Sequence, residues 1–369
     1  MPFLRAAGYL LLGYLLTGAS SQQQQQQQQQ EQQSHPIRVQ SAVVLGNVTS
    51  DNYPDVSRDA GWESQIGGHW LKFYADTLTC DGDGGPTGPC HGFASNTLVA
   101  ATDDPVVNHD IVGPGPGNNP SALCAPVTEN TRPQFSAIIS TGINTGVAWY
   151  HSVGPATPED INGAVVNSGV ATITWDGDGS TPSCEMSAPM WDYTEPVWGD
   201  KGVWGPGVDG YVYTLGGLSS LAPGYEDSYI YLSRVPFGNF WDVDAYEYWN
   251  GSAWDTQRLT YPNYNDWAPA AVVTGTAGTL LYSDYYTSYV YVQSDWSSMY
   301  FQRERKPLTS SKKRQVLIPL DESRYHSQDG LVNTRTVVGP GDPLRIHGRN
   351  RLCSCAADAL RHQRQDHDY

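Results

Sequence analysis

Two aspartates in the first third of the chain have the spacing that acid–base chemistry requires. Asp59 and Asp76 are separated by a segment long enough for a strand, a turn and a return strand, so both carboxylates could reach one central channel. Two carboxylates flanking a glycosidic bond hydrolyse it, because one protonates the leaving oxygen while the other attacks or activates water. The charge of Arg58 would keep one acid ionised and leave the other to carry the proton. The alternative is a plain turn, where Asp close to glycine is common.

A second group of candidate residues lies in VWGDKGVWGPGVDGYVYTLGG (197–217). This segment would place Trp198, Trp204 and Asp209 at the open end of one blade-like sheet. Aromatic faces beside a carboxylate at such a place suit the binding of a sugar. The alternative is that the tryptophans pack between sheets. The segment also contains the pattern GxGxxG, but a strand pattern follows it and not a helix, which argues against dinucleotide binding.

Metal and cofactor sites are not expected. Two Asp-Gly-Asp-Gly loops, beginning at Asp81 and Asp176, resemble the start of a calcium loop, but Gly92 and Ser187 stand where the twelfth-position Glu belongs. No zinc motif of the CxxC or HExxH type occurs. No nucleotide, haem or flavin is indicated. Four histidines lack metal-ligand spacing and are expected in surface or turn positions: His69, His91, His109 and His151.

The elements that must position these residues read as short antiparallel strands. Alternating or β-branched and aromatic runs are separated by Gly, Pro, Asn and Asp, and helical periodicity is scarce. Four units of about four strands can be counted between residues 68 and 302. Such units pack radially into a propeller, because a single meander cannot bury both of its faces. The expected fold is therefore an all-β propeller, with a β-sandwich as the alternative.

The charge distribution marks a boundary near residue 302. The net charge of −17 excludes an electrostatic nucleic-acid binder. Residues 301–369 nevertheless hold 13 of the 21 Lys and Arg residues and only 8 of the 38 Asp and Glu residues. We therefore separate a propeller domain (38–302) from a basic segment (303–369), which is either a disordered tail or the product of a wrong gene assembly.

The N-terminus predicts export. Residues 1–20 have the basic, apolar and small-residue regions of a signal peptide, with a membrane anchor as the alternative, and 21–37 is a Gln-rich linker. We expect a secreted monomer with no membrane association after cleavage. Secretion favours disulfides. Cys80 and Cys90 flank a Gly-rich loop that they would close, and Cys124 and Cys184 could also pair. Asn47 and Asn250 begin glycosylation sequons.

The ordered series RDAGWES, FYADT, WGPGVDGYVYTLGG, GYEDSYIYLSRVP, DAYEYWNG and LYSDYYTSYVYVQS resembles a secreted family known as domain of unknown function 4185. The resemblance covers about residues 38–302. Characterised members are endo-D-arabinanases of glycoside hydrolase family 183, which implies a five-bladed β-propeller. Such members close the ring with a final blade, so the basic segment here implies a last blade that is incomplete or replaced.

The resemblance also implies roles for the acids. The family's Arg-Asp-Gly-Gly segment appears with Ala60 in place of one glycine, and its Phe-Gly-Asp-Thr segment appears with Ala75. Both methyl groups would reshape the pocket. We expect Asp59 as nucleophile and Asp76 as acid/base. The expected substrate contacts come from six residues: Arg58, Trp62, Ser64, Asn96, Trp204 and Asp209.

The resulting hypothesis is a secreted glycoside hydrolase that acts on an arabinofuranose-type or related polysaccharide through a pair of aspartates. Two alternatives remain open at this point: a carbohydrate-binding propeller without catalysis, and an inactive truncated family member.

Overall fold

The computed structural model describes residues 42–304 and three later strands at 315–319, 335–337 and 345–347. Gaps in the first range fall at 44, 46–47, 54, 81–89, 116–118, 156–162, 178, 223–228, 261–272, 275–277, 284–287 and 295–297. In this part of the chain the regular elements are β-strands and one 3₁₀ turn, η2 (Val243–Ala245). The expected all-β class is confirmed. No helix among the described residues is long and apolar enough to cross a membrane.

The described strands form five sheets. The first has the order β2 (Thr49–Ser50), β6 (Val107–Asp110), β5 (Cys90–Ala101), β4 (His69–Cys80), β3 (Val56–Ile66). The second has the order β10 (Ser183–Met186), β9 (Val165–Thr174), β8 (Thr145–Val153), β7 (Arg132–Ser140), and β11 (Trp191–Asp192) also pairs with β9. The third has the order β12 (Val197–Trp204), β13 (Tyr211–Gly217), β14 (Tyr229–Pro236), β15 (Glu247–Trp249), β16 (Trp254–Asp255), and β17 (Val273–Thr274) pairs with β14.

The last two sheets include strands from the basic segment. The fourth has the order β18 (Gly278–Ser283), β19 (Ser288–Ser294), β20 (Ser298–Glu304), β21 (Gln315–Pro319), and the fifth has the order β1 (Ala42–Val43), β23 (Arg345–His347), β22 (Arg335–Val337). Segment 303–369 therefore contributes described strands where the sequence pattern predicted none. The pairings β1–β23 and β2–β6 are parallel, and the others are antiparallel.

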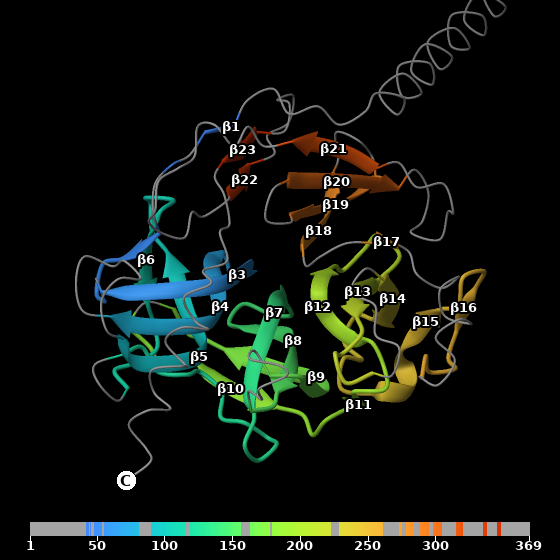
Figure 1. Ribbon diagram of the computed structural model, residues 1–369, viewed down its shortest axis with the longest axis horizontal. Coiled ribbons are helices and arrows are strands. Elements are labelled where there is room, and N and C mark those ends of the chain that lie inside the picture. Colours follow the sequence, from blue (N-terminus) through green and yellow to red (C-terminus); the bar gives the residue numbers. More distant parts are fainter. Residues whose placement is uncertain are drawn as a thin grey trace, which may run out of the picture.

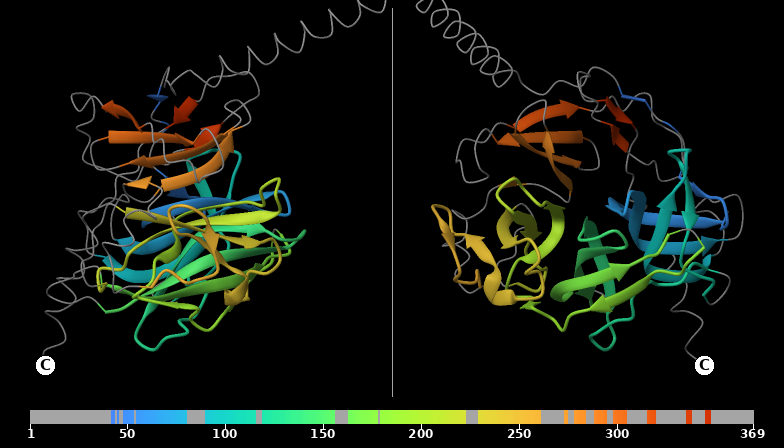
Figure 2. Two further views of the ribbon diagram at one scale, coloured as in Figure 1. Left: turned by 90° about the vertical axis from the view of Figure 1, so that its right-hand side faces the viewer. Right: turned by 180° about the vertical axis from the view of Figure 1, so that it is seen from behind.

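The sheets follow one another around a ring, which is seen from its two sides in Figures 1 and 2. Strands β3, β7, β12 and β18 lie toward its middle, and each contacts the next. Two contacts show that the first three run in the same direction. Gly67, in the turn after β3, closely approaches the backbone of Ile143, in the turn after β7. At the other end Ser219, beside the start of β12, donates to the Val165 carbonyl, beside the start of β7.

The core lies between successive sheets. Phe73 and Leu98 of the first sheet pack against Phe135 and Tyr150 of the second, and Phe73 and Phe135 stack with ring centroids 4.8 Å apart. Trp198 is buried between the second and third sheets, where it contacts Tyr248. Trp198 is therefore a packing residue, as the alternative reading of this tryptophan proposed.

One disulfide is present among the described side chains, and it joins Cys124 to Cys184. This bond ties the segment before β7 to β10. It is one of the pairings that the sequence analysis considered. Cys80 and Cys90 lie opposite each other in the register of β4 and β5. Their side chains lie outside the described part of the structure, so that disulfide stays a prediction. The signal peptide, the Gln-rich linker and Asn47 also lie outside it.

Candidate active site

Asp59 and Asp76 face each other across the first two strands of the first sheet. They are register partners in the antiparallel pair β3–β4, so their side chains share one face. Directly opposite residues in such a pair have Cβ atoms about 4.5–5.5 Å apart. Both side chains are partly exposed, and Asp76 is so although its neighbours along β4 from Leu71 to Thr77 are buried. The register therefore places Asp59 and Asp76 side by side, as their spacing in the sequence permits.

The normal alternation of side chains is broken just beside this pair. Along a regular strand, residues three apart point to opposite faces. Phe73 and Asp76 nevertheless both contact β7. On the other face, Tyr74 and Thr77 both join the network around Arg58. The change of face therefore falls at Ala75.

The residues beside Ala75 on the two neighbouring strands explain this change. Register places Ala60 of β3 and Asn96 of β5 at the same level, between the Asp59–Asp76–Ser95 row and the next one. Ala60 has φ 45° and Asn96 has φ 49°, in the left-handed region that disfavours residues with a side chain. These two distortions turn the acids toward the second sheet. Non-glycine residues held in this way are typical of sites where a side chain has to be re-aimed.

The two carboxyl groups have different electrostatic surroundings. The pKa of Asp59 is raised to about 6, mainly by desolvation; the hydrogen bond from the backbone N–H of Ala60 opposes this rise, and the charge of Asp76 adds to it. Desolvation also raises the pKa of Asp76, but Arg132 and a hydrogen bond from Gln134 act against this rise. The proton is therefore held more readily on Asp59. This order is the reverse of the roles expected from the sequence.

Three residues of the second sheet complete the surroundings of Asp76, and sequence reasoning missed all of them. Gln134 Nε2 lies 3.4 Å from Asp76 Oδ1, and Gln134 Oε1 lies 3.1 Å from His151 Nε2. Arg132 stands two residues before Gln134 on β7. A signal for them exists in the sequence, since polar side chains interrupt two apolar strands at positions that a hairpin places opposite each other. His151 had been expected in a surface or turn position, and it is instead a half-buried strand residue that contacts Gln134.

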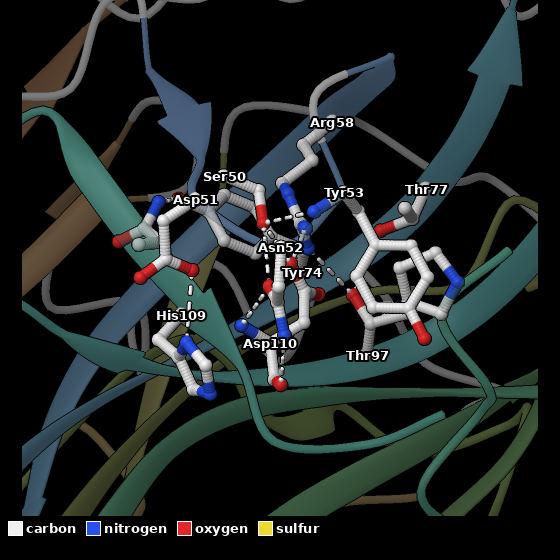
Figure 3. Close-up of polar contacts among 12 residues, drawn as sticks. Ser50, Asp51, Asn52, Tyr53, Arg58, Tyr74, Thr77, Thr97, His109 and Asp110 are labelled. Atoms are coloured by element: carbon white, nitrogen blue, oxygen red, sulfur yellow. Dashed lines mark hydrogen bonds and ion pairs between the residues drawn. The ribbon is translucent and has the colours of Figure 1, made fainter. Parts of the chain in front are cut away.

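Arg58 does not contact either acid. It lies on the opposite face of β3, where its guanidinium forms a buried ion pair of 2.5 Å with Asp110 and donates to Thr97 Oγ1 at 3.3 Å. It also stacks over the ring of Tyr74. Figure 3 shows this network and the hydrogen bond from Ser50 to Asp110, which ties β2 to β6. The positive charge next to Asp76 is supplied by Arg132. The expectation that Arg58 keeps one of the acids ionised is therefore wrong.

Ser64 and Asn96 hold the strands around the acids in place. Ser64 Oγ accepts the N–H of Ile138 and so ties β3 to β7. Asn96 is fully buried, and its amide bonds the backbone of Cys124 and Pro133. Trp62 is different, because it is partly exposed, stands opposite Phe73 and shares its face with the acids.

Trp204 and Asp209 lie toward the opposite face of the ring from the two acids. Trp204 ends β12 and Asp209 follows in the turn, whereas Asp59 lies near the start of β3, and the two strands run in the same direction. Trp204 packs against Tyr213, Tyr282 and Tyr289. Asp209 accepts the hydroxyl of Tyr213 at 2.5 Å. The structure therefore separates this aromatic group from the two acids.

Two further expectations concern the surface and metals. Asn250 is exposed in the turn after β15, where its Oδ1 accepts from the backbone of Ser252 and Ala253. Within the described part of the chain, no three His, Cys, Asp or Glu side chains gather as a metal site.

Comparison with known proteins gives only loose structural likenesses. No family model and no curated protein matches the sequence. Zg3597, a family 117 glycoside hydrolase of the marine bacterium Zobellia galactanivorans, is 9% identical over 74% of this chain and 75% of its own, with a TM-score of 0.39. The GH32 β-fructofuranosidase BmSUC1 of Bombyx mori is 14% identical over 79% and 56%, with a TM-score of 0.40. An N-acetylgalactosamine deacetylase from F. plautii is 9% identical over 83% and 80%, with a TM-score of 0.41. At such TM-scores these likenesses assign no activity to this chain.

Proposed function

We propose that this chain is a secreted glycoside hydrolase of the endo-D-arabinanase type, which cleaves an arabinofuranose-containing or related polysaccharide with Asp59 and Asp76. The observation that carries the proposal is the cross-strand pair itself, with both carboxyls partly exposed and different partners around each. The ring of five sheets supports a propeller of five blades, in which β1 completes the blade of β22 and β23. A polymeric glycan is the proposed partner, and the chain acts as a monomer.

In the proposed mechanism Asp59 is the general acid and Asp76 the nucleophile. Asp59 carries the proton because its pKa of about 6 lies well above that of an ordinary carboxyl. Asp76 is the better anion because Arg132 and Gln134 favour its charged form. The Asp76 carboxylate attacks the anomeric carbon while Asp59 protonates the leaving oxygen. Asp59, now ionised, then takes a proton from water, and this water cleaves the glycosyl ester of Asp76.

The same geometry favours retention of configuration. Retaining enzymes need carboxyl groups about 5–5.5 Å apart, and inverting enzymes need about 6.5–9.5 Å to admit a water. A directly opposite cross-strand pair, with Cβ atoms about 4.5–5.5 Å apart, supports the shorter separation of the carboxyl groups. Trp62, on the same face, offers an aromatic surface for a sugar ring. Arg58, Ser64 and Asn96 act indirectly, by holding β3, β5 and β7.

The test is reducing-end release from a panel of arabinans, galactofuranans and cell-wall glycans by the wild type and by two isosteric variants. Asp59→Asn and Asp76→Asn should each lower release at least 100-fold, because each removes one partner of an acid–base pair. Loss of release in neither variant, with the wild type active, would show that the acids are not catalytic.

A substrate with a good leaving group separates the two roles. Cleavage of a 2,4-dinitrophenyl furanoside needs no proton on the leaving oxygen. Asp59→Asn should therefore keep a first-turnover burst of dinitrophenol, whereas Asp76→Asn should show none. The reverse pattern would restore the role order expected from the sequence.

A further inference from the structure

We propose that His151 is a positioning residue, which fixes the side-chain amide of Gln134 so that Gln134 donates its hydrogen bond to Asp76. This inference deepens the proposed function and rests on it for its catalytic consequence. The contacts are Asp76 Oδ1 to Gln134 Nε2 at 3.4 Å and Gln134 Oε1 to His151 Nε2 at 3.1 Å. They form a relay from the first sheet into the second.

The relay has one orientation that satisfies both contacts. An amide offers an acceptor oxygen and a donor nitrogen, and an ionised carboxylate only accepts. If the amide turned over, Gln134 Oε1 would meet Asp76 and two acceptors would face each other. Because Oε1 can only accept, the contact to His151 is a hydrogen bond only when His151 Nε2 carries the proton. His151 therefore selects the amide orientation that supports an ionised Asp76.

The backbone makes this arrangement rigid. Gln134 and His151 are direct register partners in the antiparallel pair β7–β8, so their side chains share a face. Ser64 ties β7 to β3, and Asn96 ties β5 to the carbonyl of Pro133, next to Gln134. The distance between Gln134 and Asp76 is thus set by contacts between the sheets and not by a loop.

His151 acts as a neutral donor and not as a charge. The pKa of His151 is lowered to about 4, mainly by desolvation; Asp200 opposes this fall, and Lys201 and Arg132 add to it. The charged groups that face the relay come from each packed element: Asp59 and Asp76 from the first sheet, Arg132 from the second, and Asp200 and Lys201 from β12. Above pH 5 the imidazole is neutral, so the relay keeps one form throughout the range in which Asp59 titrates.

The first test is the titration of Asp76 itself, which needs no substrate. The carboxyl carbon resonance of Asp76 is assigned by its loss in Asp76→Asn and is followed by NMR from pH 2 to 9. In His151→Phe, which keeps a ring and removes the donor, the midpoint should rise by about one pH unit, the typical worth of a hydrogen bond to a charged group. In His151→Gln, whose amide nitrogen can replace Nε2, it should stay within about 0.3 units of the wild type.

A variant on the other side of the contact keeps the test decisive if His151→Phe does not fold. Gln134→Leu should raise the midpoint of Asp76 by the same amount as His151→Phe, and the double variant should add nothing, because both break one relay. Equal midpoints in the wild type, His151→Phe and Gln134→Leu would overturn the proposal.

Activity then reports the catalytic consequence. The acidic limb of kcat/KM should move upward with the Asp76 midpoint in His151→Phe, and it should return in His151→Gln. A fall in kcat with an unmoved limb would show that His151 has only a structural role. A wild type that hydrolyses none of the glycans would overturn the proposed function, while the NMR midpoints would still decide whether the relay exists.

Discussion

Phe73 and Asp76 both contact strand β7 although they lie three residues apart on β4. Phe73 stacks on Phe135 with centroids 4.8 Å apart, and Asp76 accepts from Gln134 at 3.4 Å. A regular strand would send these side chains to opposite faces. The exchange of faces is what puts a carboxyl pair next to the second sheet, and it coincides with the left-handed backbone of Ala60 and Asn96.

This backbone strain predicts that Ala60→Gly stabilises the protein. A side chain in the left-handed region costs about 1–2 kcal/mol, and a glycine loses about 0.5–1 kcal/mol through unfolded-state entropy. The free energy of unfolding should therefore rise by about 0.5–1 kcal/mol, as measured by denaturant titration at pH 7. Ala75→Gly, at the same level of β4 but without a positive φ, is the control and should be destabilised. Equal losses in both variants would place the strain elsewhere.

The raised pKa of Asp59 predicts that Asp59→Asn is more stable than the wild type at neutral pH. Because the folded-state value of about 6 exceeds the ordinary value, the folded protein binds the proton more tightly than the unfolded chain. The contribution of Asp59 to stability is therefore fully present below pH 4 and is lost as pH rises through 6. Asn cannot ionise, so the variant should gain about 1–3 kcal/mol at pH 7 and nothing at pH 4.

Unfolding measured at both pH values checks this, with Asp55→Asn as the matched control. Asp55 is exposed just before β3, so its removal changes the net charge without touching the pair. A stability gain of the same size at pH 4 and pH 7, or an equal gain in Asp55→Asn, would show that the ionisation of Asp59 does not destabilise the folded protein.

The same group predicts an acidic pH range for catalysis. A general acid works only while protonated, so kcat/KM should fall about tenfold per pH unit above pH 6. The measurement is the pH dependence of reducing-end release under first-order conditions. A dinitrophenyl substrate, which needs no acid, should lack this falling limb. A limb that persists with that substrate would belong to another group.

Much of this site follows from the sequence, and the rest needs the fold. The distance between Asp59 and Asp76 along the chain predicts a strand, a turn and a return strand, and the register confirms that they are opposite. Alternation alone predicts that Arg58 points away from Asp59, but its pairing with Asp110 of β6 depends on the order of strands in the sheet. Gln134 and His151 could be paired as a hairpin, but nothing local places a second sheet against Asp76. The sequence also does not predict the positive φ of Ala60, because glycine is the residue that usually indicates a positive φ.

The buried pair of Arg58 and Asp110 predicts a large stability loss when one partner is removed. Their side chains are only 3% and 0% exposed, so Asp110→Ala leaves an unpaired charge inside the first sheet. We expect a loss of about 3–5 kcal/mol in the free energy of unfolding. The control is Asp51→Ala, which removes the exposed partner of His109 (Figure 3). This change should lower the free energy of unfolding by less than about 1 kcal/mol. Similar losses in the two variants would show that the Arg58 pair is not desolvated.

The separation of Trp62 from Trp204 predicts which tryptophan contacts the glycan. Trp62 shares the face of the two acids, whereas Trp204 ends β12 at the opposite end of the ring among Tyr213, Tyr282 and Tyr289. If stacking on a sugar ring is worth as much as an aromatic pair, about 0.5–1.5 kcal/mol beyond burial, Trp62→Ala should raise KM about 3–10-fold, and Trp62→Phe should raise it less. Trp204→Ala should lower the unfolding temperature and leave KM within about twofold, because its contacts are to protein side chains. A rise in KM in Trp204→Ala and not in Trp62→Ala would place the glycan at the other end of the ring, away from Asp59 and Asp76.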